Sequence, residues 1–545
     1  MPEVVLFQPA LGYWEYFVRD VPISLLAVAR HVAPRHSVEL VDGRVPGWRE
    51  RLAAALATGP RCLGITVKTG RPITFALEAA AIARRVAPRV PIVWGGVHPS
   101  LLPEQTLENP AVDVVVQGEG EETFRDLVEA LGDPAPDLAR VPGLWLRRDG
   151  EVVHTGARPV VSLNALTPLP YELVRFADYE GRSALGAERA GFFETGRGCP
   201  WTCHYCYNER FHDARWRPFK ADKIVEHLRH LRSFWEVSTL YFVDDSFFTD
   251  SKRPVALAET LLEGELGLTW RCEGCVHDLA RLTDAELATI RRSGCDWVAM
   301  GVETGSARLR ATYDKRLDVT ELHEVNRRLG KAGIHANFNI MTGFLGEELD
   351  DLRATTQLAL GLLDENPRAT VQSFQAAVPY PGTRYASAVE EAGYPLPARL
   401  EDWQRTNPED WMRTVPWLDA SRRNLLRSLF LASLFVDGKV RERAGSGPRG
   451  WPLRLLGALY RPLARLRIRH LLSAFPLEAV LFDSLLNRRY VEAAARPGRA
   501  ASPVTAGAAA TVLPPAGPQG GHLGGAGWSG EPDAALGRDA PRALA

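Results

Sequence analysis

Short apolar runs alternate with helical patterns from Val4 to Leu131, and this alternation constrains the fold more than any other feature of the sequence. The expected strands are Val4 to Phe7, Val38 to Val41, Cys62 to Thr66, Ile92 to Trp94 and Val112 to Val116. The expected helices are Ile23 to His31, Trp48 to Ala57, Ile73 to Ala87, Leu101 to Leu107 and Thr123 to Leu131. Continuous apolar strands that alternate with helices form a parallel sheet covered on both faces. The pattern predicts an α/β, doubly wound, Rossmann-like domain that binds ligands at the carboxyl ends of its strands.

A second alternating series begins near Gly191. Its expected strands are Gly191 to Thr195, Thr239 to Val243, Leu268 to Arg271, Trp297 to Gly301, Ala336 to Met341 and Thr370 to Ala376. Six parallel βα units predict a (β/α)6 partial TIM barrel, with its chemistry at the carboxyl ends of the strands.

Turn residues and composition place the boundaries of the expected domains. The runs 144–147 and 152–155 flank an Asp-Gly turn, which is typical of a hairpin. We expect a Rossmann-like domain over 1–140, a hairpin and linker over 141–184 and a partial barrel over 185–420. A helical region follows over 421–497, and the Ala-, Gly- and Pro-rich tail over 498–545 is predicted to be disordered.

Charge and cysteine content narrow the class of protein. The 545 residues carry 65 basic and 66 acidic side chains, and this balance indicates no nucleic-acid partner. No apolar run is long enough to span a bilayer, and the first residues lack the features of a signal peptide. We therefore expect a cytoplasmic location, where seven cysteines favour metal or catalytic thiols over disulfides.

The strongest chemical signal is TGRGCPWTCHYC, in which Cys199, Cys203 and Cys206 have the spacing CxxxCxxC directly after an expected strand. Thiolates this close on one loop can ligate a single iron–sulfur cluster. Three protein ligands leave one iron of a 4Fe–4S cluster open. The alternative is a structural zinc site completed by a distant residue, for which the CxxC pair Cys272 and Cys275 is a candidate.

This loop resembles the signature of the radical S-adenosylmethionine (SAM) superfamily, in which CxxxCxxC with an aromatic before the last cysteine follows the first barrel strand. The resemblance implies that SAM chelates the open iron. It also implies the SAM-binding residues: Tyr205 in the loop, Asp244 and Asp245 in FVDDSFF, Glu303 in MGVETGS, and Gly343 in MTGFLGEE. Helix capping is the alternative for the aspartates, and plain turn chemistry for the other strand ends.

The first domain carries its own strand-end motifs, which include WGGVHPS and VQGEGEE. Paired glycines there form a smooth floor for a flat ligand, whereas the absence of GxGxxG after the first strand disfavours a dinucleotide. The alternative is a domain with tight turns and no ligand. The set resembles the cobalamin-binding domain that precedes some radical SAM barrels. The resemblance implies cobalamin contacts from Asp42, Thr66, Thr69, Gly95, Gly96, His98, Gly118, Glu119 and Gly120. Because DxHxxG is missing, we do not expect His98 to ligate cobalt.

Membership in this cobalamin-dependent group implies an enzyme, and most characterised members resemble methyltransferases. We expect a 5′-deoxyadenosyl radical and methylcobalamin to methylate an unactivated carbon, or phosphorus, of a small-molecule, lipid or peptide substrate. An external flavodoxin- or ferredoxin-type donor supplies electrons, and bacterial specialised metabolism is the expected setting. Radical cyclisation, ring contraction or rearrangement is the alternative, and a non-catalytic cobalamin and iron–sulfur sensor is the remote one. No catalytic side chain is assigned.

The remaining cysteines and the arginine-rich end of the chain leave alternatives open. Cys272, at the end of the third barrel strand, either faces the barrel mouth or is a buried small residue, and with Cys275 it is a candidate for an extra metal. Arginines alternate with leucines in LRLLGALYRPLARLRIRHLL. This stretch either lies on an anionic membrane or packs its leucines on the barrel, and we favour the packing.

Overall fold

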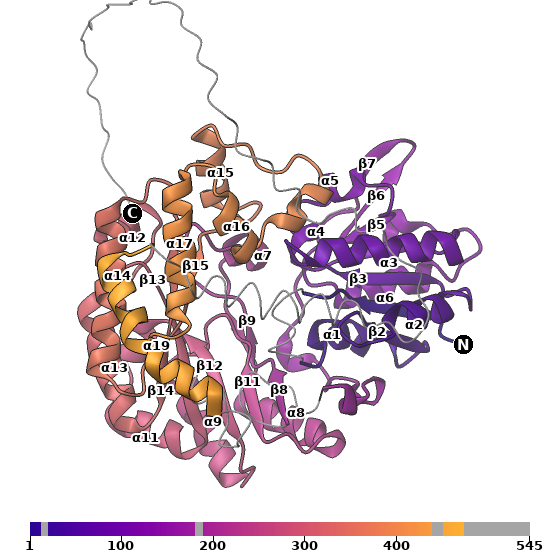
Figure 1. Ribbon diagram of the computed structural model, residues 1–545. Coiled ribbons are helices and arrows are strands. Elements are labelled where there is room, and N and C mark those ends of the chain that lie inside the picture. The colour runs from indigo at the N-terminus through magenta and orange to yellow at the C-terminus, as the bar shows by residue number, and fades with distance from the viewer. Residues whose placement is uncertain (12–19, 180–188, 439–450, 474–545) are drawn as a thin grey trace, which may run out of the picture. The chain divides into compact units, whose positions relative to one another are not determined.

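The computed structural model describes residues 1–11, 20–179, 189–438 and 451–473 (Figure 1). The first sheet has seven strands in the order β2-β1-β3-β4-β5-β6-β7. Their bounds are β1 Val4–Gln8, β2 Val38–Asp42, β3 Cys62–Thr66, β4 Ile92–Gly95, β5 Val114–Val116, β6 Leu144–Arg148 and β7 Glu151–His154. The strands β1 to β5 are parallel, which confirms the predicted doubly wound sheet.

Helices cover both faces of this sheet, because its strands are apolar on both sides. They are α1 Ile23–Val32, α2 Trp48–Leu56, α3 Pro72–Val86, α4 Val97–Leu101, α5 Pro103–Glu108 and α6 Glu121–Ala130. The helices α1 and α6 pack with Val4 and Leu6 on one face, while α2 and α3 pack with Val5 and Phe7 on the other. Successive residues of β1 therefore contribute to two separate cores.

The predicted hairpin is confirmed, and it continues the first sheet. The strand β6 pairs antiparallel with β5 and with β7. The turn consists of Asp149 and Gly150, both with positive φ, and this conformation suits the twist of a two-residue hairpin.

The second sheet is open and has six strands in the order β15-β14-β13-β12-β11-β8, as the prediction of a partial barrel requires. Their bounds are β8 Ala190–Phe193, β11 Thr239–Phe242, β12 Thr269–Gly274, β13 Cys295–Glu303, β14 His335–Thr342 and β15 Thr370–Ala376. All five pairings are parallel. The short strands β9 Gly196–Arg197 and β10 Arg217–Pro218 pair separately beside the cysteine loop.

Helices follow the strands of this sheet, and most of them cover its outer side, whereas α7 lies toward the first domain and contacts α4 (Figure 1). They are α7 Asn208–His212, α8 Ala221–Phe234, α9 Lys252–Glu263, α10 Val276–Ala280, α11 Asp284–Arg292, α12 Ala307–Thr312, α13 Val319–Ala332, α14 Leu349–Glu365 and α15 Arg384–Glu391. Short 3₁₀ turns lie at η2 Leu138–Arg140, η3 Leu163–Ala165, η4 Tyr171–Leu173 and η5 Phe176–Asp178.

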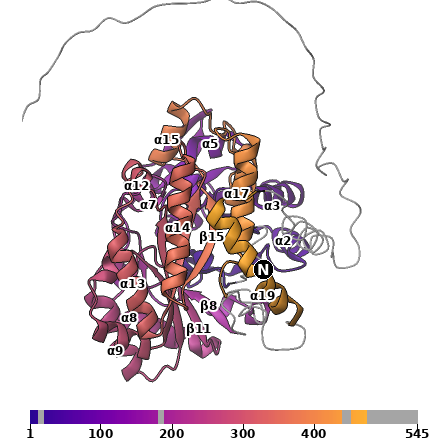
Figure 2. The same cartoon turned by 60° about the vertical axis from the view of Figure 1, so that its left-hand side comes forward.

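The helical region after the barrel comprises η6 Leu400–Arg405, α16 Pro408–Thr414, α17 Ala420–Ser433 and α19 Trp451–His470. The helix α17 packs on β15, and α19 lies against α17 and α14 (Figure 2). The predicted disordered tail lies outside the described residues. Among the helices in the described ranges, none combines the length and apolar character needed to cross a bilayer.

The favoured packing of the arginine–leucine stretch is wrong for most of its leucines. In α19 the side chains of Leu455, Leu459, Leu463 and Leu466 are exposed. Smaller or branched residues, Ala464 and Ile468 among them, occupy the packed face instead. The small residues Gly457 and Ala464 are buried on this face, where α19 packs near α17, and the leucines lie on the opposite side.

Candidate functional site

The cysteine loop begins where β9 ends, and its first turn requires glycine. Gly198 has a φ of +80°, and a Cβ there would lie 2.0 Å from the Arg215 carbonyl oxygen. The chain then turns back so that the Cys206 N–H donates to the Cys203 carbonyl oxygen at 3.0 Å. All three loop cysteines are free and partly exposed. Glycine is needed here because no other residue fits this backbone and this close approach.

A turn after α12 fixes the loop from the opposite side. The His204 N–H donates to the Tyr313 carbonyl oxygen at 3.1 Å, and the Thr202 hydroxyl donates to Asp314 at 2.7 Å. The next residue, Lys315, lies 3.8 Å from Glu303. Burial opposes the charge of Lys315, but Glu303 and then the thiols of the loop raise its pKa overall. The loop therefore contains three sulfurs beside one buried cation.

Burial raises the pKa of the Cys206 thiol to about 12, and the nearby Cys203, Asp245 and Glu303 add to this effect. A positively charged centre is needed to make such thiols good ligands, as bound metals do. Within the described ranges, no three His, Cys, Asp or Glu side chains lie close enough together for a single metal ion. An iron–sulfur cluster takes its protein ligands on separate irons, so the three thiolates of this loop can hold one cluster.

The two cysteines of the CxxC pair have different surroundings. Cys272 is completely buried in the barrel core, beside Cys295. Cys275 lies against the Cys199 thiol of the loop and 3.9 Å from the Ser246 hydroxyl. This arrangement gives no support to an extra metal bound by Cys272 and Cys275. Cys272 is a buried small residue, as the alternative interpretation of the sequence expected.

The two aspartates after β11 also differ in burial, since Asp244 is buried and Asp245 is exposed. Asp244 is buried, and its two oxygens accept from the Thr195 N–H at 2.7 Å and the Thr195 hydroxyl at 2.6 Å. Burial raises its pKa to about 6, although Arg253 and Thr195 oppose the shift. Asp245 is exposed and accepts from the Gly198 N–H at 3.1 Å. Only the second carboxylate is therefore available at the cysteine loop.

The other expected SAM residues are Tyr205 within the loop, Glu303 at the end of β13 and Gly343 directly after β14. Tyr205 packs its ring on Phe344, with the ring centroids 6.0 Å apart. Glu303, at the end of β13, has a φ of +62°, and burial raises its pKa. Gly343 has a φ of +75°, and its N–H donates to Glu347 at 2.8 Å.

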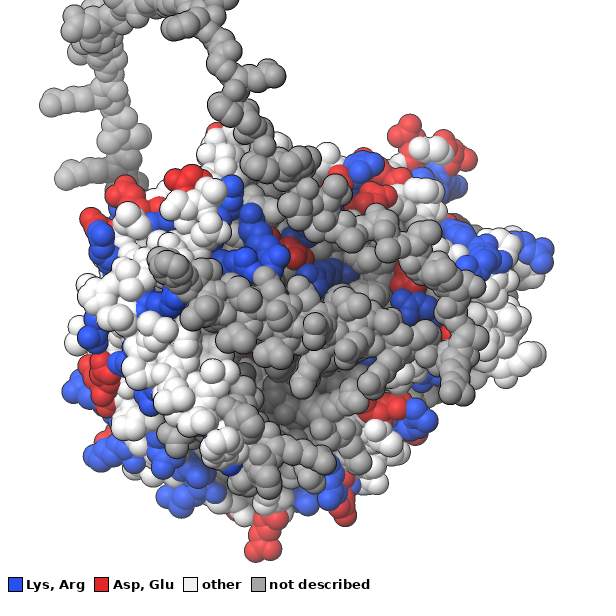
Figure 3. Space-filling model, viewed as in Figure 1, with Lys and Arg blue, Asp and Glu red and all other residues white. Residues whose placement is uncertain are grey.

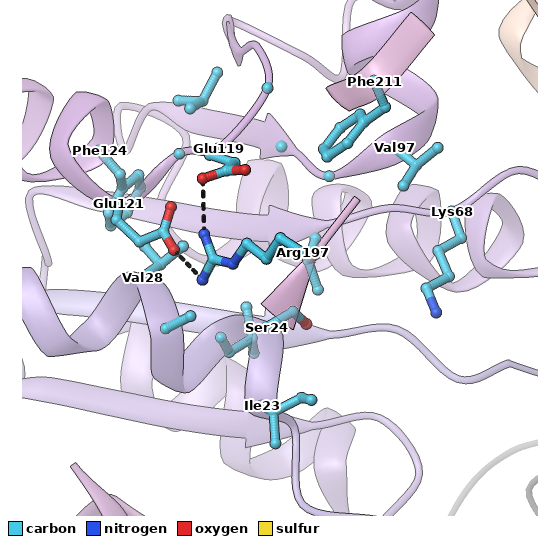
Figure 4. Close-up of a pocket in the computed structure, with 18 of the residues that line it drawn as sticks. Ile23, Ser24, Val28, Lys68, Val97, Glu119, Glu121, Phe124, Arg197 and Phe211 are labelled. Carbon is cyan, nitrogen blue, oxygen red and sulfur yellow. Dashed lines mark hydrogen bonds and ion pairs between the residues drawn. The ribbon is translucent and has the colours of Figure 1, made fainter. Parts of the chain in front are cut away.

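A cavity of about 320 Å³ lies between the carboxyl ends of the first sheet and the segments that follow β8 and β11, and the residues on either side of the cysteine loop, Arg197 and Tyr207, line it. Its residues from the first domain include Thr66, Gly95, Gly96, Gly118, Glu119 and Gly120. Those from the second include Glu194, Arg197, Tyr207, Phe211, His212 and Asp245. Figure 4 shows α1 side chains such as Ile23 and Val28 along one wall. The volume is at the lower end of small-molecule sites.

Glycine is necessary on the floor of this cavity. Gly96 has a φ of +93°, and a Cβ there would lie 2.9 Å from the Thr66 hydroxyl. Gly118 has a φ of +72° with open space beside it. This floor fits a flat ligand, because the glycines carry no side chains at the ends of the strands, where a ligand would lie.

Ion pairs between the two domains cross the cavity. Arg197 points between Glu119 and Glu121, at 2.9 and 2.7 Å (Figure 4). Arg217 also pairs with Glu119, and His212 lies 3.3 Å from it. Burial alone would raise the pKa of Glu119, but His212 and the two arginines lower it to about 2.

Three expected cobalamin residues do not line the cavity. Asp42 is buried and accepts from Arg44 and from the Tyr179 hydroxyl, both at 2.8 Å. Thr69 bonds Nδ1 of His98 at 3.0 Å, and the His98 ring is fully buried beside Trp403. Burial lowers the pKa of His98 to about 3. Thr69 and His98 contact each other, and the His98 N–H donates to the Val67 carbonyl oxygen next to the floor residue Thr66, whereas Asp42 is held by Arg44 and Tyr179.

Sequence reasoning missed Lys315, Arg197 and the pair formed by Tyr241 and Glu273, whose atoms lie 2.7 Å apart near Asp245. The only signal for Arg197 is its position two residues before the first cysteine. Tyr241 and Glu273 alternate with core residues in their strands, and this period points them to the inner side of the barrel. Lys315 gives no signal, because a turn far along the chain brings it to the loop.

The fold and the site define an enzyme with a partial barrel, in which the cysteine loop lies on the side of the α/β domain that carries the glycine floor. Comparison with known proteins agrees, since residues 193–359 match the radical SAM superfamily and residues 18–128 match the B12 binding domain. The B12 binding domain followed by the radical SAM domain identifies a cobalamin-dependent radical SAM enzyme, whose cofactors are a 4Fe–4S cluster, SAM and cobalamin.

An uncharacterised methyltransferase of Pyrococcus horikoshii is 28% identical over 67% of this chain and 77% of that protein. A second relative is the anaerobic magnesium-protoporphyrin IX monomethyl ester cyclase of Rubrivivax gelatinosus, which is 27% identical over 55% of this chain. The match spans 54% of the length of the cyclase. The solved structure of the cobalamin-dependent SAM radical enzyme OxsB, with aqua-cobalamin and SAM bound, superposes with a TM-score of 0.68. That match covers 90% of this chain and 75% of the other at 17% identity, and it supports the fold.

Proposed function

We propose that this protein is a methyltransferase that methylates an unactivated carbon, or phosphorus, of a small-molecule, lipid or peptide substrate. The observation that carries the proposal is the single cavity lined by both the glycine floor and the aspartate beside the cluster loop. The methyltransferase name of the Pyrococcus relative favours methyl transfer. When bound, the cluster and SAM supply a 5′-deoxyadenosyl radical, and cobalamin supplies the methyl group.

In this proposal Cys199, Cys203 and Cys206 ligate three irons, and Lys315 offsets part of the negative charge of the thiolates. Asp245 accepts from the ammonium group of SAM, because its carboxylate is exposed at the cluster loop. Tyr205, Glu303 and Gly343 complete the SAM site. Asp244 acts indirectly, by holding Thr195 at the end of β8.

The corrinoid would be held over the floor that consists of Thr66, Gly95, Gly96, Gly118 and Gly120. Glu119 holds Arg197 and Arg217 at one end of that floor. Apolar side chains of α1 and α6 at the wall exclude water from the site, and this exclusion protects a radical from quenching. Asp42, Thr69 and His98 position the floor loops without contact to the ligand in this scheme.

The proposed division into domains is 1–140, 141–184, 185–420, 421–497 and 498–545, with the hairpin attached to the first sheet. An external flavodoxin- or ferredoxin-type electron donor and a cytoplasmic location are further proposals. They rest on the resemblance alone, as does the setting in bacterial specialised metabolism.

The test uses the full chain, loaded anaerobically with iron, sulfide and cobalamin. SAM with a deuterated methyl group and a strong reductant are added, and mass spectrometry follows 5′-deoxyadenosine, S-adenosylhomocysteine and the methyl group on cobalamin. We expect all three products from the wild type and from Cys62→Ala, a cysteine buried in β3. Cys203→Ala should lose 5′-deoxyadenosine.

The outcomes separate the candidate functions. If 5′-deoxyadenosine forms but cobalamin never gains the deuterated methyl group, radical cyclisation or rearrangement replaces methyl transfer. The name of the Rubrivivax relative, a cyclase, favours this second candidate. If a chain loaded with both cofactors yields neither product, a sensor replaces the enzyme.

A further inference from the structure

The helix α19 presents an apolar row to solvent. Its members are Trp451, Leu455, Leu459, Leu463 and Leu466, which are spaced by four, four, four and three residues. This spacing places them on one side of the helix. The side chain of Leu459 is 71% exposed and that of Trp451 is 58% exposed. Scattered exposed leucines need no explanation, but a continuous row along about four turns of helix does.

The other side of α19 packs against the rest of the protein. Ala464 and Ile468 are fully buried against the barrel, and the ring of Tyr460 packs on Phe435 with centroids 5.2 Å apart. Arg461 donates to the Val436 carbonyl oxygen, and Arg465 pairs with Asp364 of α14. These contacts fix the rotation of the helix, so the apolar row cannot turn inward.

The charge of α19 has one sign. Residues 451–470 contain five arginines and neither aspartate nor glutamate. In Figure 3 the surface at the position of α19 is largely white, with blue patches at its margins. An apolar row with a terminal tryptophan and flanking arginines is the pattern of a helix that lies in the interface of an anionic bilayer.

We propose that α19 docks this protein on an anionic lipid surface through Trp451, Leu455, Leu459, Leu463 and Leu466. Arg467 is buried and Arg465 is paired with Asp364, so the exposed Arg469 carries the free charge of the helix. A second copy of the chain is a poorer occupant, because a two-fold contact would bring together two helices that carry arginines but no acidic side chain. A lipid surface instead supplies the opposite charge and buries the leucines at once. The inference goes beyond the proposed methyl transfer and does not depend on it.

The test is flotation of the full chain with vesicles of phosphatidylcholine and phosphatidylglycerol in equal parts. The wild type should float with them, and high salt should weaken the binding. Leu459→Glu combined with Leu463→Glu should reduce the floated fraction about tenfold or more. The matched control is Leu262→Glu, an exposed leucine in the last turn of α9, which should float like the wild type. Iron and cobalamin loading should be equal in all three chains.

A second variant keeps the test decisive if the double glutamate chain fails to fold. Arg469→Glu changes only an exposed charge and should weaken flotation on the anionic vesicles. Deuterium exchange over 451–470 should slow when these vesicles are added to the wild type.

Several results would overturn the proposal. They are no flotation of the wild type, equal flotation of the double variant, or equal binding to vesicles of phosphatidylcholine alone. Light scattering that shows a dimer, which the double variant breaks, would assign the face to a second copy instead.

Discussion

Asp244 and Asp245 are adjacent in the sequence, but the fold gives them different partners. Asp244 is buried with Thr195 and lies 3.6 Å from Arg253. Asp245 is exposed beside the cysteine loop. A carboxylate with saturated buried partners stabilises the fold, whereas an exposed one at a cavity is free to bind a ligand.

Replacing each aspartate should therefore have different effects. Asp244→Ala leaves the buried Arg253 guanidinium without its carboxylate and should cost about 3–5 kcal/mol of stability. Asp245→Ala should leave the melting temperature within about 2 °C and weaken SAM binding about 30-fold, the loss of one charge-assisted hydrogen bond. Calorimetry of unfolding and of SAM binding measures the two effects. Equal losses of stability in both variants would contradict this assignment.

Gly198 is the glycine on which the cysteine loop depends most. Gly198→Ala brings a Cβ to 2.0 Å from the Arg215 carbonyl oxygen, so the loop has to move. We expect the iron bound per chain to fall about tenfold or more, because misplaced thiols no longer share a cluster. The control is Gly267→Ala, which also has a positive φ but has open space around it. It should cost only about 1 kcal/mol and keep its iron. Full iron loading in Gly198→Ala would show that the loop tolerates the shift.

At the scale of elements, the segment after the barrel returns to the first domain. The turn η6 packs on α3 and α5, and Trp403 is buried there with its ring N–H donating to Gln105 at 2.7 Å. Two further contacts join these parts, since Arg71 binds Asp410 through two hydrogen bonds. This segment holds the floor of the cavity from the side of His98.

Trp403→Ala should therefore loosen the first domain. The cavity left by a buried tryptophan costs about 3–5 kcal/mol, and limited proteolysis should cleave the first domain faster. The control is Trp451→Ala on the exposed face of α19, which should change stability by less than about 0.5 kcal/mol in the absence of lipid. If the two variants are equally resistant, the segment from 400 to 410 does not hold the floor.

The elements themselves follow from the sequence with small errors. The predicted strand Cys62 to Thr66 matches β3 residue for residue, and Trp297 to Gly301 is the centre of the longer β13. Period and apolar content determine such strands locally. The orientation of α19 was predicted wrongly, because its row of leucines and its row of small residues have the same helical period. The side of α19 that is buried is determined by its contacts with α17 and α14, which the sequence pattern of α19 does not contain.

The site was less predictable than the fold. The cysteines and glycines could be found because their chemistry depends on residue type and spacing. The partners of Asp42 and Asp244, by contrast, are Tyr179 and Arg253, and no local pattern links those residues. Lys315 reaches the cysteine loop only through the closure of the barrel sheet. Contacts of this kind depend on the three-dimensional fold and are invisible to motif reasoning.

At the scale of the molecule, the carboxyl ends of two parallel sheets open on one cavity. Gly95 and Gly118 come from the first sheet, and Asp245 and Tyr207 come from the second, next to Cys206. The ion pairs of Arg197 with Glu119 and Glu121 link the two sides. Each of these side chains exposes less than a tenth of its surface, so these pairs are costly to break singly. Under the proposed function, this arrangement would bring a corrinoid and a cluster to the same space, as methyl transfer to a substrate radical requires.

The most direct test of this arrangement is the electron paramagnetic resonance spectrum of the full chain, loaded with both cofactors and reduced to the cob(II)alamin and one-electron-reduced cluster states. The account predicts that the two spins are coupled, so the spectrum is split or broadened relative to the sum of the separate signals. Cys203→Ala loaded with cobalamin supplies the isolated cobalt signal. A spectrum of the doubly loaded chain that equals the simple sum of two uncoupled signals would contradict the claim that one cavity joins the two cofactors.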